Sequence, residues 1–204
     1  MEEIIAAVLE ALPKAGLVEV EVSARHVHLT AAHVEVLFGR GAALTPKRPL
    51  SQPGQFLSQE RVALVGPRGR KEHTAVLGPP RPVTQVEVSR SDCVELGLED
   101  VPLRESGDVA GSGGITLQGP CGALVLEEGV IIAHNHVHLT PHAARMLGLD
   151  DGQRVSVAAV TDRPLVFTDV MIRVHPKFAN RMHVDFDEAN AAHVAGFTLG
   201  HIVP

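Results

Sequence analysis

The sequence contains no tryptophan and no tyrosine, and its 6 phenylalanines are the only aromatic residues besides histidine. Proteins that stack nucleic-acid bases need several such rings on one surface. The chain also has a net charge of -6 and no long basic run, whereas nucleic-acid surfaces are strongly basic. We therefore expect no nucleic-acid partner.

Cysteines are scarce and long apolar runs are missing. Cys93 and Cys121 are the only two cysteines and neither belongs to a CxxC pair, so neither a disulfide framework nor a thiolate zinc site is indicated. No apolar run approaches the roughly 18–20 residues of a membrane span. The N-terminal segment lacks the basic region and cleavage site of a secretory signal. These features predict a cytoplasmic protein without a membrane partner.

Histidine, in contrast, is abundant, with 12 residues. This composition predicts roughly 0.7 His-x-His pairs by chance, so one pair would carry little information. The pentapeptide HVHLT, however, occurs twice, at His26–Thr30 and at His136–Thr140. His134 extends the second copy into His-x-His-x-His. The repetition indicates an internal duplication and a shared chemistry.

Both copies of HVHLT have the same predicted surroundings. A strand precedes each copy, and before the first it shows the alternation of Val18, Val20 and Val22. Each threonine is placed to cap a short helix that ends near a glycine, over about 31–39 and 141–148. An apolar stripe predicts a further helix over 3–12, and the segment 84–92, TQVEVSRSD, is predicted to be a strand.

These patterns define the expected fold class. Most predicted elements are short strands separated by Gly and Pro turns, and long alternations of strand and helix are missing, which disfavours a parallel α/β sheet or a TIM barrel. We predict a mainly β protein with short capping helices. The duplication further predicts two small β-barrels with related structures.

The spacing within each histidine pair favours metal binding. Residues i and i+2 of a strand point to the same face, so His26 and His28 can converge on one point, as can His136 and His138. Neutral imidazole is a common zinc ligand, and two histidines from one strand need one or two further ligands from elsewhere. The alternative is a set of histidines that are hydrogen-bonded at a domain interface.

Three further residues each have two possible interpretations. Glu87 alternates with Val86 and Val88, so it faces away from them and is either a ligand or part of a solvated strand face. His183 lies in an extended acidic stretch and is either a ligand or a surface histidine. Arg81 lies between prolines on a stiff loop, where its planar guanidinium suits phosphate recognition, although most arginines are simply solvated.

Six segments taken together resemble one known family, the phosphotransacylases of propanediol-utilisation type, also called phosphate propanoyltransferases. They are VSARHVHLT, LSQPGQF, LGPPRPVTQVEVSRSD, RESGD, GVIIAHNHVHLTP and MHVDFDEANAA, and they span Val18 to Ala192. The resemblance implies two closely packed β-barrels. Residues 1–14 would form an amphipathic helix, 15–24 with 134–204 the first barrel, and 25–133 the second barrel with a small inserted sheet at about 39–59.

The resemblance also implies roles for individual residues. Two zinc ions per chain would each have three protein ligands: His26, His28 and Glu87 for one, and His136, His138 and His183 for the other. Arg81 would hold phosphate, and coenzyme A would contact Leu77, Asn190 and a basic residue at Lys47 or Arg48; Ser23 and Ser106 are further candidates. Two positions depart from the family pattern, where Ala75 and Asn135 replace arginines of relatives.

The implied reaction exchanges a short acyl group, propanoyl or acetyl, between coenzyme A and phosphate by direct attack of phosphate on the thioester. The implied partners are acyl-CoA, phosphate and further copies of the chain, with a dimer favoured. In some relatives an N-terminal helix docks into a bacterial microcompartment for propanediol degradation, which gives a second expected location for this protein and shell or lumen proteins as partners.

Three alternatives remain open from the residues. A zinc hydrolase, either a thioesterase or an amidohydrolase-like enzyme, also uses His-x-His, but the amidohydrolase barrel needs about 250 residues. A cupin has a glutamate three or four residues after the pair, whereas Glu35 lies seven after His28. A non-enzymatic metal-binding protein would favour clustered exposed histidines over two pairs on strands.

Overall fold

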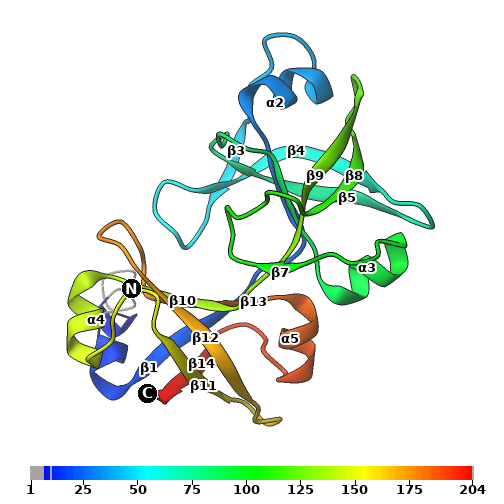
Figure 1. The fold of residues 1–204 in the computed structure, drawn as a ribbon. Coiled ribbons are helices and arrows are strands. Elements are labelled where there is room, and N and C mark those ends of the chain that lie inside the picture. Colours follow the sequence, from blue (N-terminus) through cyan, green and yellow to red (C-terminus); the bar gives the residue numbers. More distant parts are fainter. Residues whose placement is uncertain (1–6, 10, 204) are drawn as a thin grey trace. The chain divides into compact units, whose positions relative to one another are not determined.

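The computed structural model describes residues 7–9 and 11–203 of the chain. The chain divides into two compact units: Met1–Ser23 with Ser51–Pro53 and His134–Pro204, and Ala24–Leu50 with Gly54–Ala133. Each unit is built around a closed ring of six strands (Figure 1). The mainly β fold with two barrels and short helices, which the sequence predicted, is thereby confirmed.

The barrel of the first unit takes one strand from the start of the chain and five from its end. Its strands are β1 (Leu17–Val22), β10 (His136–Leu139), β11 (Arg154–Val160), β12 (Val166–Val174), β13 (Arg181–Val184) and β14 (Thr198–Val203). They pair around the ring in the order β1-β13-β10-β12-β11-β14, and β14 returns to β1. Alternate residues fill the interior, among them Val20, Val137 and Met182, which are at most 1% exposed.

The barrel of the second unit comes from the middle of the chain. Its strands are β2 (His26–His28), β4 (Phe56–Val65), β5 (Arg70–Gly78), β6 (Gln85–Glu87), β8 (Gly113–Gln118) and β9 (Ala123–Ala133). The ring runs β4-β5-β2-β6-β9-β8 and closes through the β8–β4 pair. Two short strands lie outside the ring, β3 (Pro46–Pro49) against β4 and β7 (Leu103–Arg104) against β9.

The two rings have the same pairing pattern. The strand that carries the HVH sequence, β2 or β10, pairs antiparallel with one neighbour, β6 or β13, and parallel with the other, β5 or β12. The remaining strands also correspond, β4 with β11, β8 with β14, and β9 with β1. The first strand of each repeat therefore closes the barrel built mainly by the other repeat, because β1 pairs with β13 and β9 pairs with β6.

Short α-helices follow corresponding strands of the two units, and the 3₁₀ helix η1 precedes β1. They are η1 (Leu12–Ala15), α2 (Ala31–Phe38), α3 (Arg90–Leu96), α4 (Pro141–Leu147) and α5 (Phe186–Ala191). The predicted caps are confirmed, because the Thr30 and Thr140 side chains accept hydrogen bonds from backbone N–H groups in the first turns of α2 and α4. Half of the predicted helix over 3–12 lies outside the described residues, and residues 7–9 and 11 are helical.

The predicted strand over 84–92 is wrong in its second half. Strand β6 ends at Glu87, and helix α3 begins at Arg90. The reason is a capping box at Ser89, whose side chain accepts from the Asp92 N–H while the Asp92 carboxylate accepts from the Ser89 N–H. The chain therefore turns into a helix directly after the ligand strand.

Residues 51–53 group with the first unit, whereas the family resemblance implied that they belong to the second barrel. The cause is Gln52, which is buried and bonds through its side chain to both the N–H and the carbonyl of Ala179.

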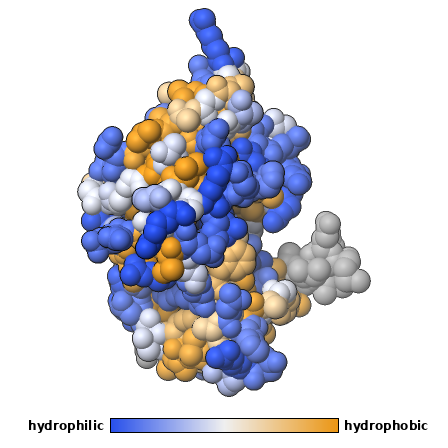
Figure 2. Space-filling view, turned by 90° about the vertical axis from the view of Figure 1, so that its right-hand side faces the viewer, coloured by the Kyte–Doolittle hydropathy of each residue, from blue (hydrophilic) through white to orange (hydrophobic). Residues whose placement is uncertain are grey.

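On the face drawn in Figure 2, hydrophilic and hydrophobic residues are interspersed. Among the described residues, none of the helices combines the length and the apolar character that crossing a membrane requires.

Candidate metal centres

In the second unit, strand register brings three metal-ligating side chains together. His26 and His28 lie on β2, and His26 is directly opposite Glu87 on the antiparallel strand β6. Val27, between the two histidines, is opposite Val86, which precedes Glu87, and both valines are fully buried in the core. Because neighbouring residues of a strand point to opposite faces, the three polar side chains share the face away from the core.

The distances in this group fit a tetrahedral metal ion. The Nε2 atoms of His26 and His28 are 3.1 Å apart, and His26 Nε2 is 3.5 Å from Glu87 Oε2. Zinc with bonds of 2.0–2.1 Å in tetrahedral geometry separates its ligand atoms by about 3.3 Å. His26 Nδ1 lies 2.8 Å from the Ala24 carbonyl, so this nitrogen carries a proton and the contact orients the ring with Nε2 toward His28 and Glu87.

The charges of the group also suit a metal. Burial raises the pKa of Glu87, but His26, His28 and the Ser106 hydroxyl together outweigh it, so the net pKa of this carboxyl lies below its usual range. Burial lowers the pKa of His28 well below its ordinary value, and His26 and Arg81 act in the same direction. The site therefore presents a carboxylate and a neutral imidazole, the forms that bind metals.

A hydrogen-bond network connects Glu87 to Arg81. The Ser106 hydroxyl donates to Glu87 Oε1 at 2.9 Å and accepts from Arg81 Nη1 at 3.3 Å. Gln85 Nε2 donates to the same Glu87 oxygen at 2.6 Å, and Gln85 Oε1 accepts from the Gly107 N–H at 2.7 Å. The predicted residues Arg81 and Ser106 therefore lie beside this group, and Gln85 is a residue that the sequence reasoning missed.

The backbone also positions Arg81. Its N–H donates to the carbonyl of Leu29 at 2.8 Å, just after the HVH sequence. The loop is therefore attached to the end of β2, and the guanidinium is placed by both its own backbone and Ser106. A fixed guanidinium next to a metal-ligand set is suited to hold an oxyanion.

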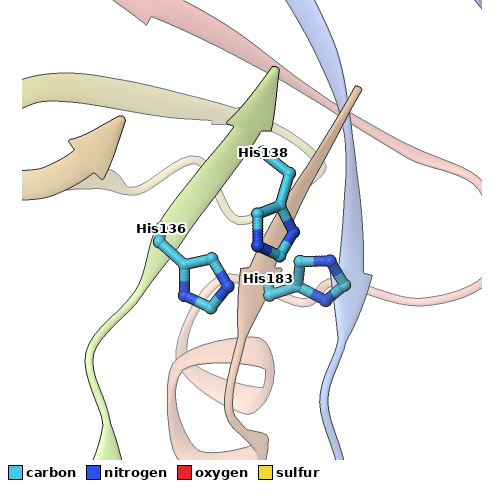
Figure 3. A group of neighbouring side chains, drawn as sticks. All are labelled: His136, His138 and His183. Carbon is cyan, nitrogen blue, oxygen red and sulfur yellow. The ribbon is translucent and has the colours of Figure 1, made fainter. Parts of the chain in front are cut away.

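In the first unit, three histidines converge in the same way. Figure 3 shows His136 and His138 on β10 and His183 on β13, with the three rings gathered on one side of the strands. His136 is directly opposite His183, and the ring centroids of the three pairs are 4.6 to 5.3 Å apart. The ligand atoms of each of the two groups all lie within 4.8 Å of one another.

The imidazoles of the first unit are also prepared for a metal. His136 Nδ1 lies 2.8 Å from the His134 carbonyl, which matches the contact of His26 and leaves Nε2 with its lone pair. Burial, reinforced by His136 and His183, lowers the pKa of His138 to about 2, so this ring is neutral at ordinary pH. The donor sets therefore fit a metal in both units, as His₂Glu and as His₃, both of which occur in catalytic zinc sites.

Two neighbours of the histidine group were not predicted. Gln52 Nε2 lies 3.4 Å from His183 Nε2, and Phe178 packs on His138 with ring centroids 4.1 Å apart. Gln52 comes from a segment rich in Pro and Gly, and its sequence holds no periodic signal for such a contact.

The remaining predicted residues have different surroundings. Leu77 on β5 is directly opposite His28, whereas Lys47 and Arg48 are exposed on β3, which is separated from β2 by β4 and β5. In the first unit, Ser23 follows β1 and donates its N–H to the Val184 carbonyl, and Asn190 is exposed near the end of α5. Their roles as contacts to coenzyme A stay predictions.

The fold and the ligand groups together define a double β-barrel protein with two candidate metal centres of catalytic type. Comparison with known proteins narrows this class. The family model described as phosphate propanoyltransferase matches residues 19–195. The chain therefore belongs to the phosphate propanoyltransferase family, which is a family of acyltransferases, and the resemblance seen in the sequence is confirmed.

Individual relatives cover nearly the whole chain. The phosphate propanoyltransferase of Leptotrichia buccalis is 49% identical over 181 residues, which are 89% of this chain and 84% of the relative. That of Thermotoga maritima is 48% identical, over 96% of this chain and 93% of the relative. That of Listeria monocytogenes is 45% identical, over 97% and 93%.

Proposed function

We propose that this protein transfers a short acyl group, propanoyl or acetyl, between coenzyme A and inorganic phosphate. The observation that carries the proposal is the connection of Arg81 to the ligand group through Ser106 and Glu87. It provides a fixed cation for phosphate beside three side chains that suit a metal ion. Membership of the phosphate propanoyltransferase family supports the same reaction.

Each ligand group would hold one zinc ion. His26, His28 and Glu87 would bind one ion, and His136, His138 and His183 the other, with an open coordination position at each. When bound, zinc would supply Lewis-acid stabilisation of thiolate and of carbonyl oxygen. The chain contributes the tautomers of His26 and His136, which the carbonyls of Ala24 and His134 fix.

The step itself requires no nucleophile from the protein. A phosphate oxygen forms a bond to the thioester carbonyl carbon, the carbon–sulfur bond breaks, and the thiolate takes up a proton to give free coenzyme A and acyl phosphate. Arg81 would hold the attacking phosphate and stabilise the negative charge that develops on the carbonyl oxygen of the thioester. Lys47 or Arg48, Leu77 and Asn190 are proposed contacts for coenzyme A, and Ser23 is a further candidate near the site.

The test is a thiol-release assay on protein of measured metal content. Free thiol is followed from propanoyl-CoA and acetyl-CoA with and without inorganic phosphate. We expect release that requires phosphate, a zinc content of two per chain and loss of activity on chelation. Release without phosphate would indicate a thioesterase instead. No release from zinc-replete protein would contradict the proposed reaction.

A further inference from the structure

One row of side chains in the second barrel extends from the candidate metal ligands to an arginine. Glu87 is opposite His26, His26 is opposite Ala75, and Ala75 is opposite Arg61, across the adjacent strands β6, β2, β5 and β4. Residues opposite one another in a sheet share a face. Arg61 therefore lies on the face that carries His26 and Glu87, with only the small Ala75 side chain between it and His26.

The corresponding row of the first barrel differs in two ways. There His183, His136, Met171 and Arg154 are opposite one another in the same order. Met171, a large and buried side chain, stands where the second barrel has Ala75. The charge of Arg154 is balanced, because Arg154 Nη1 is 3.5 Å from the carboxylate of Asp169.

Arg61 has no such balance. Its Nη1 atom donates to the carbonyl oxygens of Ser58 and Glu60, both at 2.6 Å, and among the described residues it forms no ion pair with a carboxylate. A half-buried guanidinium that bonds only to carbonyls keeps its full positive charge and most of its five N–H donors for a ligand.

The surroundings of Arg61 are open and basic. Arg61 lines a cavity of about 200 Å³ together with Arg70, His73, Gln118 and Glu72. The one carboxylate of this lining, that of Glu72, is paired with Arg70. No carboxylate of the lining therefore neutralises the positive charge of Arg61, and the cavity is suited to an anion.

We propose that Arg61 binds a phosphate group of a substrate on the sheet face that carries His26 and Glu87. Arginine is suited to phosphate because its planar fork can donate two parallel hydrogen bonds. The proposal rests on the proposed acyl transfer, in which such a group belongs either to inorganic phosphate or to the nucleotide part of coenzyme A. Both sources have the same chemistry, and the experiment distinguishes them.

The test compares Arg61→Gln with wild type in equilibrium binding and in turnover. Calorimetric titrations use coenzyme A, pantetheine, which lacks the nucleotide phosphates, and inorganic phosphate. Losing a charge-assisted contact weakens binding roughly ten- to hundredfold. We expect this loss for coenzyme A but not pantetheine if Arg61 contacts the nucleotide, or for inorganic phosphate if it contacts the second substrate. The KM of the same substrate rises in parallel.

Arg154→Gln is the matched control, because Arg154 occupies the corresponding position and its charge is already balanced. We expect less than a twofold change in affinity for any of the three probes. Arg61→Lys keeps the charge without the fork and should recover part of the lost affinity. Circular dichroism and thermal melting establish that the variants are folded.

The outcomes separate the two proposals. Wild-type protein that lacks phosphate-dependent thiol release contradicts the acyl transfer. If the wild type is active and Arg61→Gln has unchanged affinities and KM values, the role of Arg61 is overturned and the proposed acyl transfer is not. If Arg61→Gln also melts at a lower temperature, Arg61 instead supports the bulged segment of β4. Wild type that binds neither coenzyme A nor phosphate also overturns it.

Discussion

At the scale of single residues, the Ser106 hydroxyl has an unusual position because it touches both a candidate metal ligand and a candidate phosphate ligand. It donates to Glu87 and accepts from Arg81 and Gln85. A change in the charge or position of one of these groups is therefore transmitted to the others through one oxygen atom. Arg81 and Ser106 consequently give different predictions, one for turnover and one for metal affinity.

Replacing Arg81 with alanine should abolish most turnover without unfolding the protein. Removing one electrostatic contact to the transition state typically costs about 3–4 kcal/mol, or a factor of 10²–10³ in rate. We expect kcat to fall by that factor while zinc content and melting temperature stay near those of wild type. Arg163→Ala, in an exposed turn between β11 and β12, is the control. Turnover near that of wild type in Arg81→Ala would exclude the role in phosphate binding.

Replacing Ser106 with alanine should weaken the metal centre of the second unit. Glu87 loses the hydrogen bond from Ser106 but keeps the one from Gln85. Loss of such an outer contact typically lowers metal affinity about 10–100-fold. We expect one zinc ion per chain to become easier to remove by a competing chelator, while the other keeps its affinity. Equal weakening of both ions, or of neither, would contradict the assignment of Ser106.

Several of these residues could be predicted from the sequence, and others could not. The repeated HVHLT and the alternation around Glu87 indicate which side chains share a face, because that is decided within one strand. The pairing of His26 with Glu87 joins segments 61 positions apart, and local periodicity holds no information on such a pairing. Gln52 and Gln85 lie within the segments LSQPGQF and LGPPRPVTQVEVSRSD, but no periodic spacing marks either as a neighbour of the ligands, so only the fold reveals their contacts.

At the scale of elements, the helices that follow the two ligand strands begin in the same way. Helix α3 has a capping box with Asp92, and helix α5 has one with Glu188. Each acidic residue also bonds to the residue before the histidine pair: Arg25 donates to Asp92 at 2.9 Å, and Asn135 donates to Glu188 at 2.6 Å. The pair of Asn135 and Glu188 lacks a positive charge, and burial raises the pKa of Glu188 above its ordinary value.

This difference predicts a pH-dependent gain in Asn135→Arg. Because the pKa of the Glu188 carboxyl is raised in the folded state, the free energy of unfolding of the protein falls as pH rises above 4.5, the ordinary pKa of this group. An arginine at 135 would pair with ionised Glu188, lower its pKa and remove that loss. We expect the variant to exceed wild type by about 1 kcal/mol in unfolding free energy at pH 7, and by less at pH 4, where Glu188 is protonated.

The measurement is urea unfolding of metal-free protein at both pH values, so that loss of metal at pH 4 does not contribute. Asn135→Gln is the control, since it keeps the amide donor and adds no charge, and its difference from wild type should not depend on pH. A gain for Asn135→Arg that is the same at pH 4 and pH 7, or a loss at pH 7, would refute the ion pair.

At the scale of the whole molecule, the two repeats exchange their first strands. β1, from the first repeat, completes the barrel of β10–β14, and β9, from the second, completes the barrel of β2–β8. The sequence shows the duplication through HVHLT, but both an exchanged and an unexchanged arrangement would give the same pattern. Only the long-range pairing of β1 with β13 distinguishes them, since local preferences for strand are the same in both.

The exchange predicts where a core mutation acts. Val20 on β1 is 1% exposed and Val130 on β9 is 0% exposed, and they occupy corresponding positions, opposite Met182 and Val86. Truncating either to alanine should cost about 2 kcal/mol of stability through lost burial and the remaining cavity. Because of the exchange, Val20→Ala should weaken the distant segment 134–204 more than the adjoining strand β2.

Hydrogen exchange followed by mass spectrometry measures this directly. In Val20→Ala we expect amides of β13 and β14 to exchange faster than in wild type, while those of β2, β5 and β6 change less. Val130→Ala should give the reverse pattern, with faster exchange in β6 and β8 and a smaller effect in β10 and β12. Each variant is the control for the other, because the substitution and burial are matched. If each mutation instead weakened mainly its own repeat, the strands would not be exchanged in solution.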